Sequence, residues 1–125
     1  MKYDLLAVGA AGFVGSVSRY LVYVWIGSRN TSSFPYTTLI VNLVGCFLIG
    51  AFSLLIERAV PQHRTLFLVG SVGFLGAFTT FSAFGLETLN LLRNQQPSLA
   101  IINALANVLF GIAAVWLGRT LTAFL

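Results

Sequence analysis

Gly73–Gly85 reads GFLGAFTTFSAFG, and it interrupts an otherwise apolar block with glycines, adjacent threonines and a serine. Glycine in a helix interior costs about 1 kcal/mol relative to alanine. A break at membrane depth is tolerated only where protein or a water-filled cavity satisfies the freed backbone groups. We therefore expect a membrane helix that is broken near its middle, with the break turned towards protein or water.

The apolar block around this stretch runs from about residue 66 to 92. A span needs about 20 residues to cross about 30 Å of hydrocarbon. At about 1.5 Å per residue, this block would reach about 40 Å if it were fully helical. Tilt or a break can absorb the excess. Broken spans often present carbonyls and helix ends to ions.

Three further apolar blocks cover about residues 5–26, 38–56 and 99–121. The composition agrees, because 58% of the residues are hydrophobic and only 8% are charged, against about 25% charged in soluble proteins. The sequence predicts an all-α integral membrane protein, with residues 1–125 forming one domain of four transmembrane helices. Because four helices make a thin bundle, we expect a homo-oligomer, most simply a dimer.

The basic residues lie mostly at the ends of the apolar blocks, as in membrane proteins, and form no patch for nucleic acid. One side of the predicted bundle would hold Lys2, Arg58, Arg64 and Arg119, and the other side Arg29 and Arg93. This small bias permits insertion in both orientations. The few acids stand apart, and no metal-ligand, nucleophile or phosphate-binding motif occurs, so we predict no enzyme.

Arg19 lies inside the first apolar block. An arginine at the bilayer centre costs at least about 2.5 kcal/mol on insertion scales. It should therefore reach a headgroup, pair with another group or face an aqueous vestibule. In the last case it would attract anions.

Asparagines form a second polar set, with Asn42 in the second block and Asn103 and Asn107 in the fourth. The latter two are four residues apart and share a helix face. They are either interhelical hydrogen-bonding groups or part of a polar track whose amide N–H groups replace water around an anion.

Aromatic and hydroxyl residues follow the expected break. Phe81 and Phe84 share a face, and Thr79, Thr80 and Ser82 place hydroxyls beside them. Aromatic rings have positive edges, which can contact an anion without binding it tightly. Packing against lipid or protein is the alternative for these phenylalanines.

At these residues the sequence resembles the Fluc (CrcB) family of small fluoride channels. AGFVGSVSRY resembles the glycine-rich first helix that ends in an arginine, here Arg19. TTLIVNLVGCFLIG resembles the pattern G-T-L-x-V-N-x-x-G-x-F-x-x-G and brings Thr38 and Asn42 into register. GFLGAFTTFSAFGLE resembles the third-helix motif and adds Glu87. The three segments are colinear, and the four-span plan covers nearly the whole chain.

The resemblance implies a dual-topology, antiparallel homodimer with two separate fluoride pathways. Phe81 and Phe84 would line the pore, and Asn42 would donate to the ion. Arg19 would sit at the vestibule, and Glu87 would follow the aromatic residues. The remaining members of the expected pathway are Thr38, Thr80, Ser82, Asn103 and Asn107. Backbone carbonyls of Gly76 and Thr79 from both subunits would hold a structural sodium ion on the two-fold axis.

The chain departs from the family pattern at several positions. Ala77 replaces a usual glycine, and Ala83 replaces a usual threonine. Gly111 and Val115 supply no hydroxyl on the fourth helix, which leaves the lower part of its polar track open. A paired homologous subunit is an alternative to the homodimer, since some members of the family occur as divergent pairs.

The resemblance implies passive fluoride export through a channel in the cell (inner) membrane, without ATP or an organic cofactor. A four-helix proton-coupled drug exporter is the rival from another class. That mechanism needs an acid in the first span, where only Asp4 occurs, at the edge. A structural membrane subunit is the third interpretation. It accounts for the glycines and phenylalanines, but not for the arginine and asparagines beside the Thr-Thr-Phe-Ser segment.

Overall fold

A computed structural model of the chain describes residues 2–58 and 64–124, and these residues contain helices and no strand. The helical segments, two of them π-helical (η2 and η3), are α1 (Lys2–Gly27), α2 (Tyr36–Arg58), α3 (Arg64–Phe67), η2 (Leu68–Leu75), α4 (Gly76–Phe78), α5 (Phe81–Arg93), α6 (Pro97–Leu105), η3 (Ala106–Phe110) and α7 (Gly111–Ala123).

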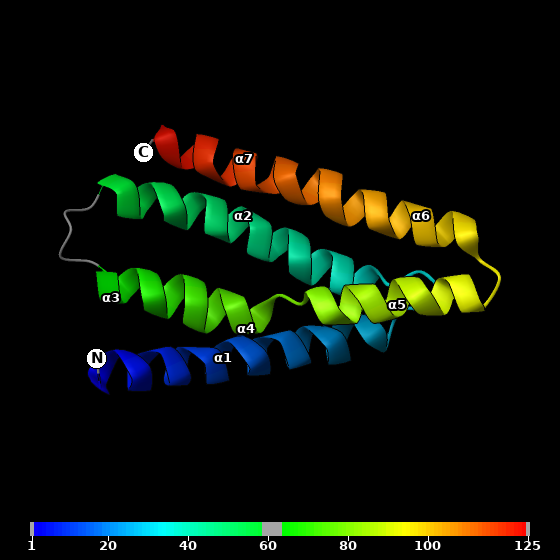
Figure 1. The fold of residues 1–125 in the computed structure, drawn as a ribbon, viewed down its shortest axis with the longest axis horizontal. Helices are drawn as coiled ribbons and strands as arrows, with labels where there is room; N and C mark the ends of the chain where they lie inside the picture. Colours follow the sequence, from blue (N-terminus) through cyan, green and yellow to red (C-terminus); the bar gives the residue numbers. More distant parts are fainter. Residues whose placement is uncertain (1, 59–63, 125) are drawn as a thin grey trace.

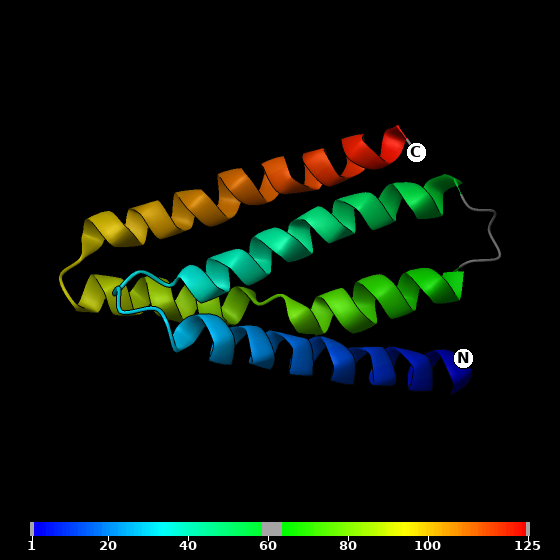
Figure 2. The ribbon, with the colours of Figure 1, turned by 180° about the vertical axis from the view of Figure 1, so that it is seen from behind.

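These segments form four rods that run alongside one another (Figure 1). Each rod contains a stretch long and apolar enough to cross a membrane, namely Tyr3–Gly27, Tyr36–Leu54, Thr65–Arg93 and Pro97–Ala123. The described N-terminal and C-terminal residues lie at the same end of the bundle (Figures 1 and 2). The protein is a multi-pass membrane protein, and the predicted all-α fold with four spans is confirmed.

The rods associate as two closely packed pairs, α1 with η2 and α4, and α2 with α7. Glycines allow the close approach. A Cβ atom at Gly15 would collide with the carbonyl oxygen of Phe74 on η2. On the other pair, a Cβ atom at Gly50 would collide with the carbonyl of Val115. Backbones that pack this closely maximise van der Waals contact, which holds helices together in lipid.

The third rod is broken at Thr79 and Thr80, as the sequence predicts. Both residues are extended, with φ/ψ of −82°/162° at Thr79 and −152°/117° at Thr80. The helix resumes at Phe81, where the Thr80 hydroxyl caps it by accepting the N–H of Ala83 at 3.2 Å. Figure 1 shows the break as a thin segment between α4 and α5. The break gives the third rod two helix ends inside the bundle.

Polar contacts connect the rods at the end that holds the termini. Arg119 forms a two-pronged ion pair with Glu57, with N–O distances of 2.9 and 2.6 Å. Thr65 donates to Asp4 at 2.9 Å. These contacts join α7 to α2 and α3 to α1. They lie far along the helices from the break, which leaves the centre of the bundle for the site described next.

Candidate functional site

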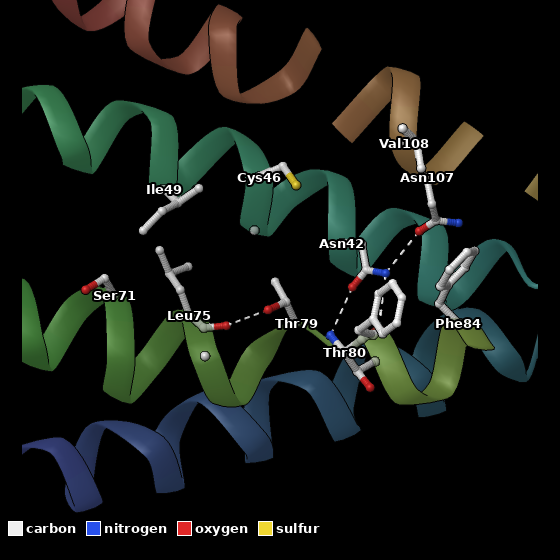
Figure 3. Close-up of a pocket in the computed structure, with 13 residues that line it drawn as sticks. Asn42, Cys46, Ile49, Ser71, Leu75, Thr79, Thr80, Phe84, Asn107 and Val108 are labelled. Atoms are coloured by element: carbon white, nitrogen blue, oxygen red, sulfur yellow. Dashed lines mark hydrogen bonds between the residues drawn. The ribbon is translucent and has the colours of Figure 1, made fainter. Parts of the chain in front are cut away.

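A cavity of about 380 Å³ opens beside the break. Residues from both sides of the break and from the second and fourth spans line it, and Figure 3 shows how they converge. The lining residues are Asn42, Gly45, Cys46, Ile49, Ser71, Leu75, Gly76, Thr79, Thr80, Phe81, Phe84, Asn107 and Val108. None of these residues carries a charge. The wall therefore offers amide, hydroxyl and aromatic groups to whatever enters.

Asn42 holds the break in place by pairing with the backbone of Thr80. Its Oδ1 accepts the Thr80 N–H at 3.0 Å, and its Nδ2 donates to the Thr80 carbonyl at 3.2 Å. Both polar backbone groups of an extended residue are thus satisfied by one side chain, which meets the requirement for non-helical backbone at membrane depth. The second Nδ2 hydrogen donates to Oδ1 of Asn107 at 3.0 Å (Figure 3).

The hydrogen bonds continue from Asn107 along a directed chain. Asn107 Nδ2 donates to both the Oδ1 and the carbonyl of Asn103, each at 3.0 Å. Asn103 Nδ2 then donates to the Thr88 hydroxyl at 2.9 Å, and Thr88 donates to the carbonyl of Phe84 at 2.8 Å. One continuous series of donors runs from the Thr80 N–H through Asn42, Asn107 and Asn103 to Thr88, so each of these bonds polarises the next, while a second Asn42 hydrogen returns to the Thr80 carbonyl.

Arg19 occupies a second cavity, of about 540 Å³, on the other side of the break. Its guanidinium donates to the carbonyl of Thr79 at 3.3 Å. The other lining residues are Ser16, Tyr20, Tyr23, Thr80, Ser82 and Ala83. Because Thr80 lines both cavities, it lies between the second cavity, which contains a cationic side chain, and the uncharged first cavity.

A third cavity, of about 290 Å³, is lined by Glu87 together with further residues of α5, of the loop after it and of the loop before α2, and this lining is partly polar and partly apolar. Thr38 is fully buried and donates to Oε1 of Glu87 at 2.6 Å. Tyr23 is hydrogen-bonded to the same Thr38 hydroxyl. Since the single proton of Thr38 goes to Glu87, Tyr23 is the donor to Thr38. Oε2 of Glu87 is buried and has no partner among the described groups.

The two pathway phenylalanines are neighbours with different environments. Their ring centroids lie 5.4 Å apart at an interplanar angle of 52°, a tilted pair. Phe84 is partly buried, whereas Phe81 is 82% exposed within the single chain. Tilted aromatic pairs present ring edges as well as faces. Phe81 in particular is turned outwards and free to contact lipid or another chain.

The break also exposes backbone oxygens suited to a hard cation. In a continuous helix the Thr80 N–H would donate to the carbonyl of Gly76, but here it donates to Asn42. The carbonyl of Thr79 accepts the guanidinium of Arg19, and a carbonyl oxygen has a second lone pair. One chain thus offers two carbonyl oxygens, and two chains would offer four. The residues fit a sodium ion shared between two chains, although the charge of Arg19 would lie nearby.

Most of the expected site residues line one of three cavities, and two of them lie outside these cavities. Asn42, Thr80, Phe81, Phe84 and Asn107 line the first cavity together with Gly76 and Thr79. Arg19 and Ser82 join Thr80 in the second cavity, and Glu87 lies in the third. Thr38 and Asn103 line none of these cavities, because both are fully buried in hydrogen-bonded positions between helices.

The structure explains two of the positions that depart from the family pattern, Gly111 and Val115. Gly111 is buried beside Cys46, whose sulfur would lie 3.5 Å from an added Cβ atom. The Val115 carbonyl packs on Gly50. Gly111 and Val115 therefore belong to the contact with α2, which needs no hydroxyl. Ala83 lines the second cavity, and its backbone N–H is satisfied by Thr80.

Two site residues escaped the sequence interpretation. Tyr23 lies four residues after Arg19 and lines the same cavity, and this spacing on one helix was an available signal. Thr88 links Asn103 to α5. A threonine on a membrane helix commonly bonds its own backbone, so no sequence signal distinguished its additional contact.

Known proteins resemble this chain over nearly its whole length. The family model described as CrcB-like protein, Camphor Resistance (CrcB), matches residues 6–119. The fluoride-specific ion channel FluC of Solibacter usitatus is 46% identical over 122 residues, which cover 97% of this chain and 98% of the relative. FluC of Ruminiclostridium cellulolyticum is 41% identical over 118 residues, covering 94% and 91%. The chain belongs to the CrcB family.

Proposed function

We propose that this protein is a fluoride-selective channel that exports fluoride passively from the cytoplasm. The observation that carries the proposal is the first cavity, whose uncharged wall combines Asn42, Asn107 and the Phe81–Phe84 pair at a broken helix. Relatives named fluoride-specific ion channels, similar over nearly their full length, support it. Hydrogen fluoride crosses membranes and dissociates in a more neutral cytoplasm, so a channel lets the trapped anion leave and lowers its toxicity.

The chemistry of the cavities supports an anion path through the break. The charge of Arg19 in the second cavity would concentrate anions there. An anion passing Thr80 would then meet neutral donors and ring edges in the first cavity. A strongly hydrated ion needs donors to replace its water, and it needs weak donors in order to leave. The first cavity, whose lining residues carry no charge, provides donors of this weak kind.

Two copies of the chain in antiparallel orientation would complete the pathways. Phe81 supports this proposal, because a large aromatic side chain at the proposed pore is 82% exposed in one chain. Phe81 also lines the first cavity, which is partly open rather than enclosed. A two-fold axis would bring the same surface of a second copy against this opening. Each copy would then contribute aromatic residues to the pathways. A paired homologous subunit could supply the same surface.

A structural sodium ion between the two copies is the part of this proposal that concerns a metal. The carbonyls of Gly76 and Thr79 would hold it, and it would neutralise oxygens that the break leaves without helical partners. We expect purified dimer to persist in sodium buffer. In buffer where a bulky organic cation replaces sodium, monomer should form. Equal dimer content in both buffers would contradict the sodium site.

Fluoride efflux from proteoliposomes tests the function directly. Liposomes that contain only this protein and are loaded with fluoride should release it without ATP or a proton gradient, once a potassium ionophore balances the charge. Chloride-loaded vesicles with the same protein control for general leakage. Efflux no faster than from empty liposomes, with folded protein present in the vesicles, would exclude the channel function.

A further inference from the structure

The Asn42 side chain has no hydrogen left for an ion in this structure. One Nδ2 hydrogen is bound to the Thr80 carbonyl, at 3.2 Å, and the other to Oδ1 of Asn107, at 3.0 Å. An asparagine amide has only these two hydrogens. An anion that takes a hydrogen bond from Asn42 must therefore displace one of the two acceptors.

The two acceptors differ in how easily they can be displaced. The Thr80 carbonyl belongs to the break, and its loss would leave a backbone oxygen without a partner at membrane depth. The bond to Asn107 joins two side chains across the wall of the first cavity. Figure 3 shows this bond beside Phe84. Side chains can rotate while the helices stay in place, so Asn107 is the acceptor that would yield.

The orientation of the Asn107 amide is set by its neighbours. Its Nδ2 donates to the Oδ1 and the carbonyl of Asn103, both at 3.0 Å. The Asn103 amide is oriented in turn by its own bond to Thr88 at 2.9 Å. Turning Asn107 over would bring oxygen against oxygen at Asn103 and N–H against N–H at Asn42. The amide oxygen of Asn107 is therefore held towards Asn42.

From this geometry we infer that Asn107 is a specificity-determining residue that acts as an internal competitor, and the inference rests on the proposed function. Its Oδ1 occupies the Asn42 N–H until an anion displaces it. A hydrogen bond to an anion is about twice as strong as one between neutral groups. Fluoride is the smallest halide and the strongest acceptor among them. It displaces the amide oxygen, whereas chloride, a weaker acceptor, does not.

Substitutions at Asn107 separate this role from direct ion binding. In Asn107→Leu the competitor is gone, so half-saturation of efflux should occur at a lower fluoride concentration, by a factor of about three to ten. The chloride-to-fluoride flux ratio should rise. In Asn107→Asp a carboxylate accepts a stronger hydrogen bond from the Asn42 N–H and also repels anions. Fluoride flux should therefore fall at least about tenfold.

The control is Thr120→Val on the same span, because its hydroxyl donates to the Trp116 carbonyl of its own helix, at 2.8 Å, and lines none of the three cavities described above. This variant should leave both the half-saturating fluoride concentration and the chloride-to-fluoride flux ratio unchanged. Asn107→Ala replaces the leucine variant if that protein does not fold. Weaker fluoride binding in the leucine and alanine variants would show that Asn107 donates to the ion. An unchanged chloride-to-fluoride flux ratio would show that Asn107 is only structural. Either result overturns the inference. Absence of efflux in the unmodified protein would instead contradict the proposed function.

Discussion

At the scale of single residues, Asn42 joins structure to function. Its amide satisfies the N–H and the carbonyl of Thr80 and still reaches Asn107 across the cavity. Aspartate and leucine have the same branching, but aspartate lacks the donors and leucine lacks both donors and acceptor. The identity of the residue is therefore constrained twice, by the break and by the proposed ion path.

Asn42→Asp should impair both the structure of the break and the proposed ion path. The carboxylate would still accept the Thr80 N–H, but it would face the Thr80 carbonyl and Asn107 Oδ1 as a third acceptor. Each acceptor left without a donor costs about 1–3 kcal/mol. We expect a lower thermal unfolding temperature together with loss of fluoride efflux. Asn90→Asp makes the same change at an exposed position of α5 and should leave the unfolding temperature unchanged. Equal unfolding temperatures for Asn42→Asp and the unmodified protein would contradict the pairing with Thr80.

The sequence identified these residues better than it identified their partners. Residue type and depth sufficed to single out Asn42, Arg19 and Asn107, because polar groups in lipid are costly. Their hydrogen-bond directions could not be predicted, since an amide can donate or accept according to its neighbours. Thr38 is an example, because its hydroxyl was expected in the ion path but donates its hydrogen bond to Glu87.

At the scale of the helices, the position of glycine decides which faces pack. Gly15 on α1 faces the backbone of η2, and an added Cβ atom would lie only 3.1 Å from the carbonyl carbon of Phe74. Gly9 on the same helix has nothing within 4 Å. The two residues therefore form a matched pair, with the same helix and the same amino acid but different surroundings.

Gly15→Ala should destabilise the protein by about 1–3 kcal/mol, because the helices must separate to admit the methyl group. Gly9→Ala should be neutral or slightly stabilising, because alanine favours helix by about 1 kcal/mol. Thermal unfolding of both purified variants in one detergent measures the difference. Equal unfolding temperatures for Gly15→Ala and Gly9→Ala would contradict the close contact between α1 and η2 at Gly15.

The broken helix was the most predictable element. Its excess length and its glycine and threonine content indicated a break near the middle, and the extended residues are Thr79 and Thr80. The π-helical turns of η2 and η3 could not be predicted. They depend on how the chain adjusts its hydrogen bonds to neighbouring helices, which a pattern of apolar residues does not encode.

At the scale of the whole molecule, the excess of Lys and Arg at one end is small, with Lys2, Arg58, Arg64 and Arg119 at the end that holds the termini against two arginines at the other end. Arg119 lies near the end that holds the termini, where Glu57 neutralises it. Arg29 and Arg93 lie at the opposite end, close to the short connections between rods. Orientation in the membrane follows the excess of Lys and Arg on one side. A chain with so small an excess has little reason to insert in a single direction.

Dual insertion predicts how cysteines at the two ends should react with a membrane-impermeant maleimide. Cys46 is first replaced by serine, because it is the only native cysteine. Thr31→Cys and Phe124→Cys then place single thiols at exposed positions on opposite ends. If both orientations occur, about half of each variant should be labelled in intact cells and all of it after permeabilisation. A single orientation would give complementary results, with one variant fully labelled and the other protected. Two half-labelled variants would mean that antiparallel pairs can form from one chain, without a second gene product of opposite orientation.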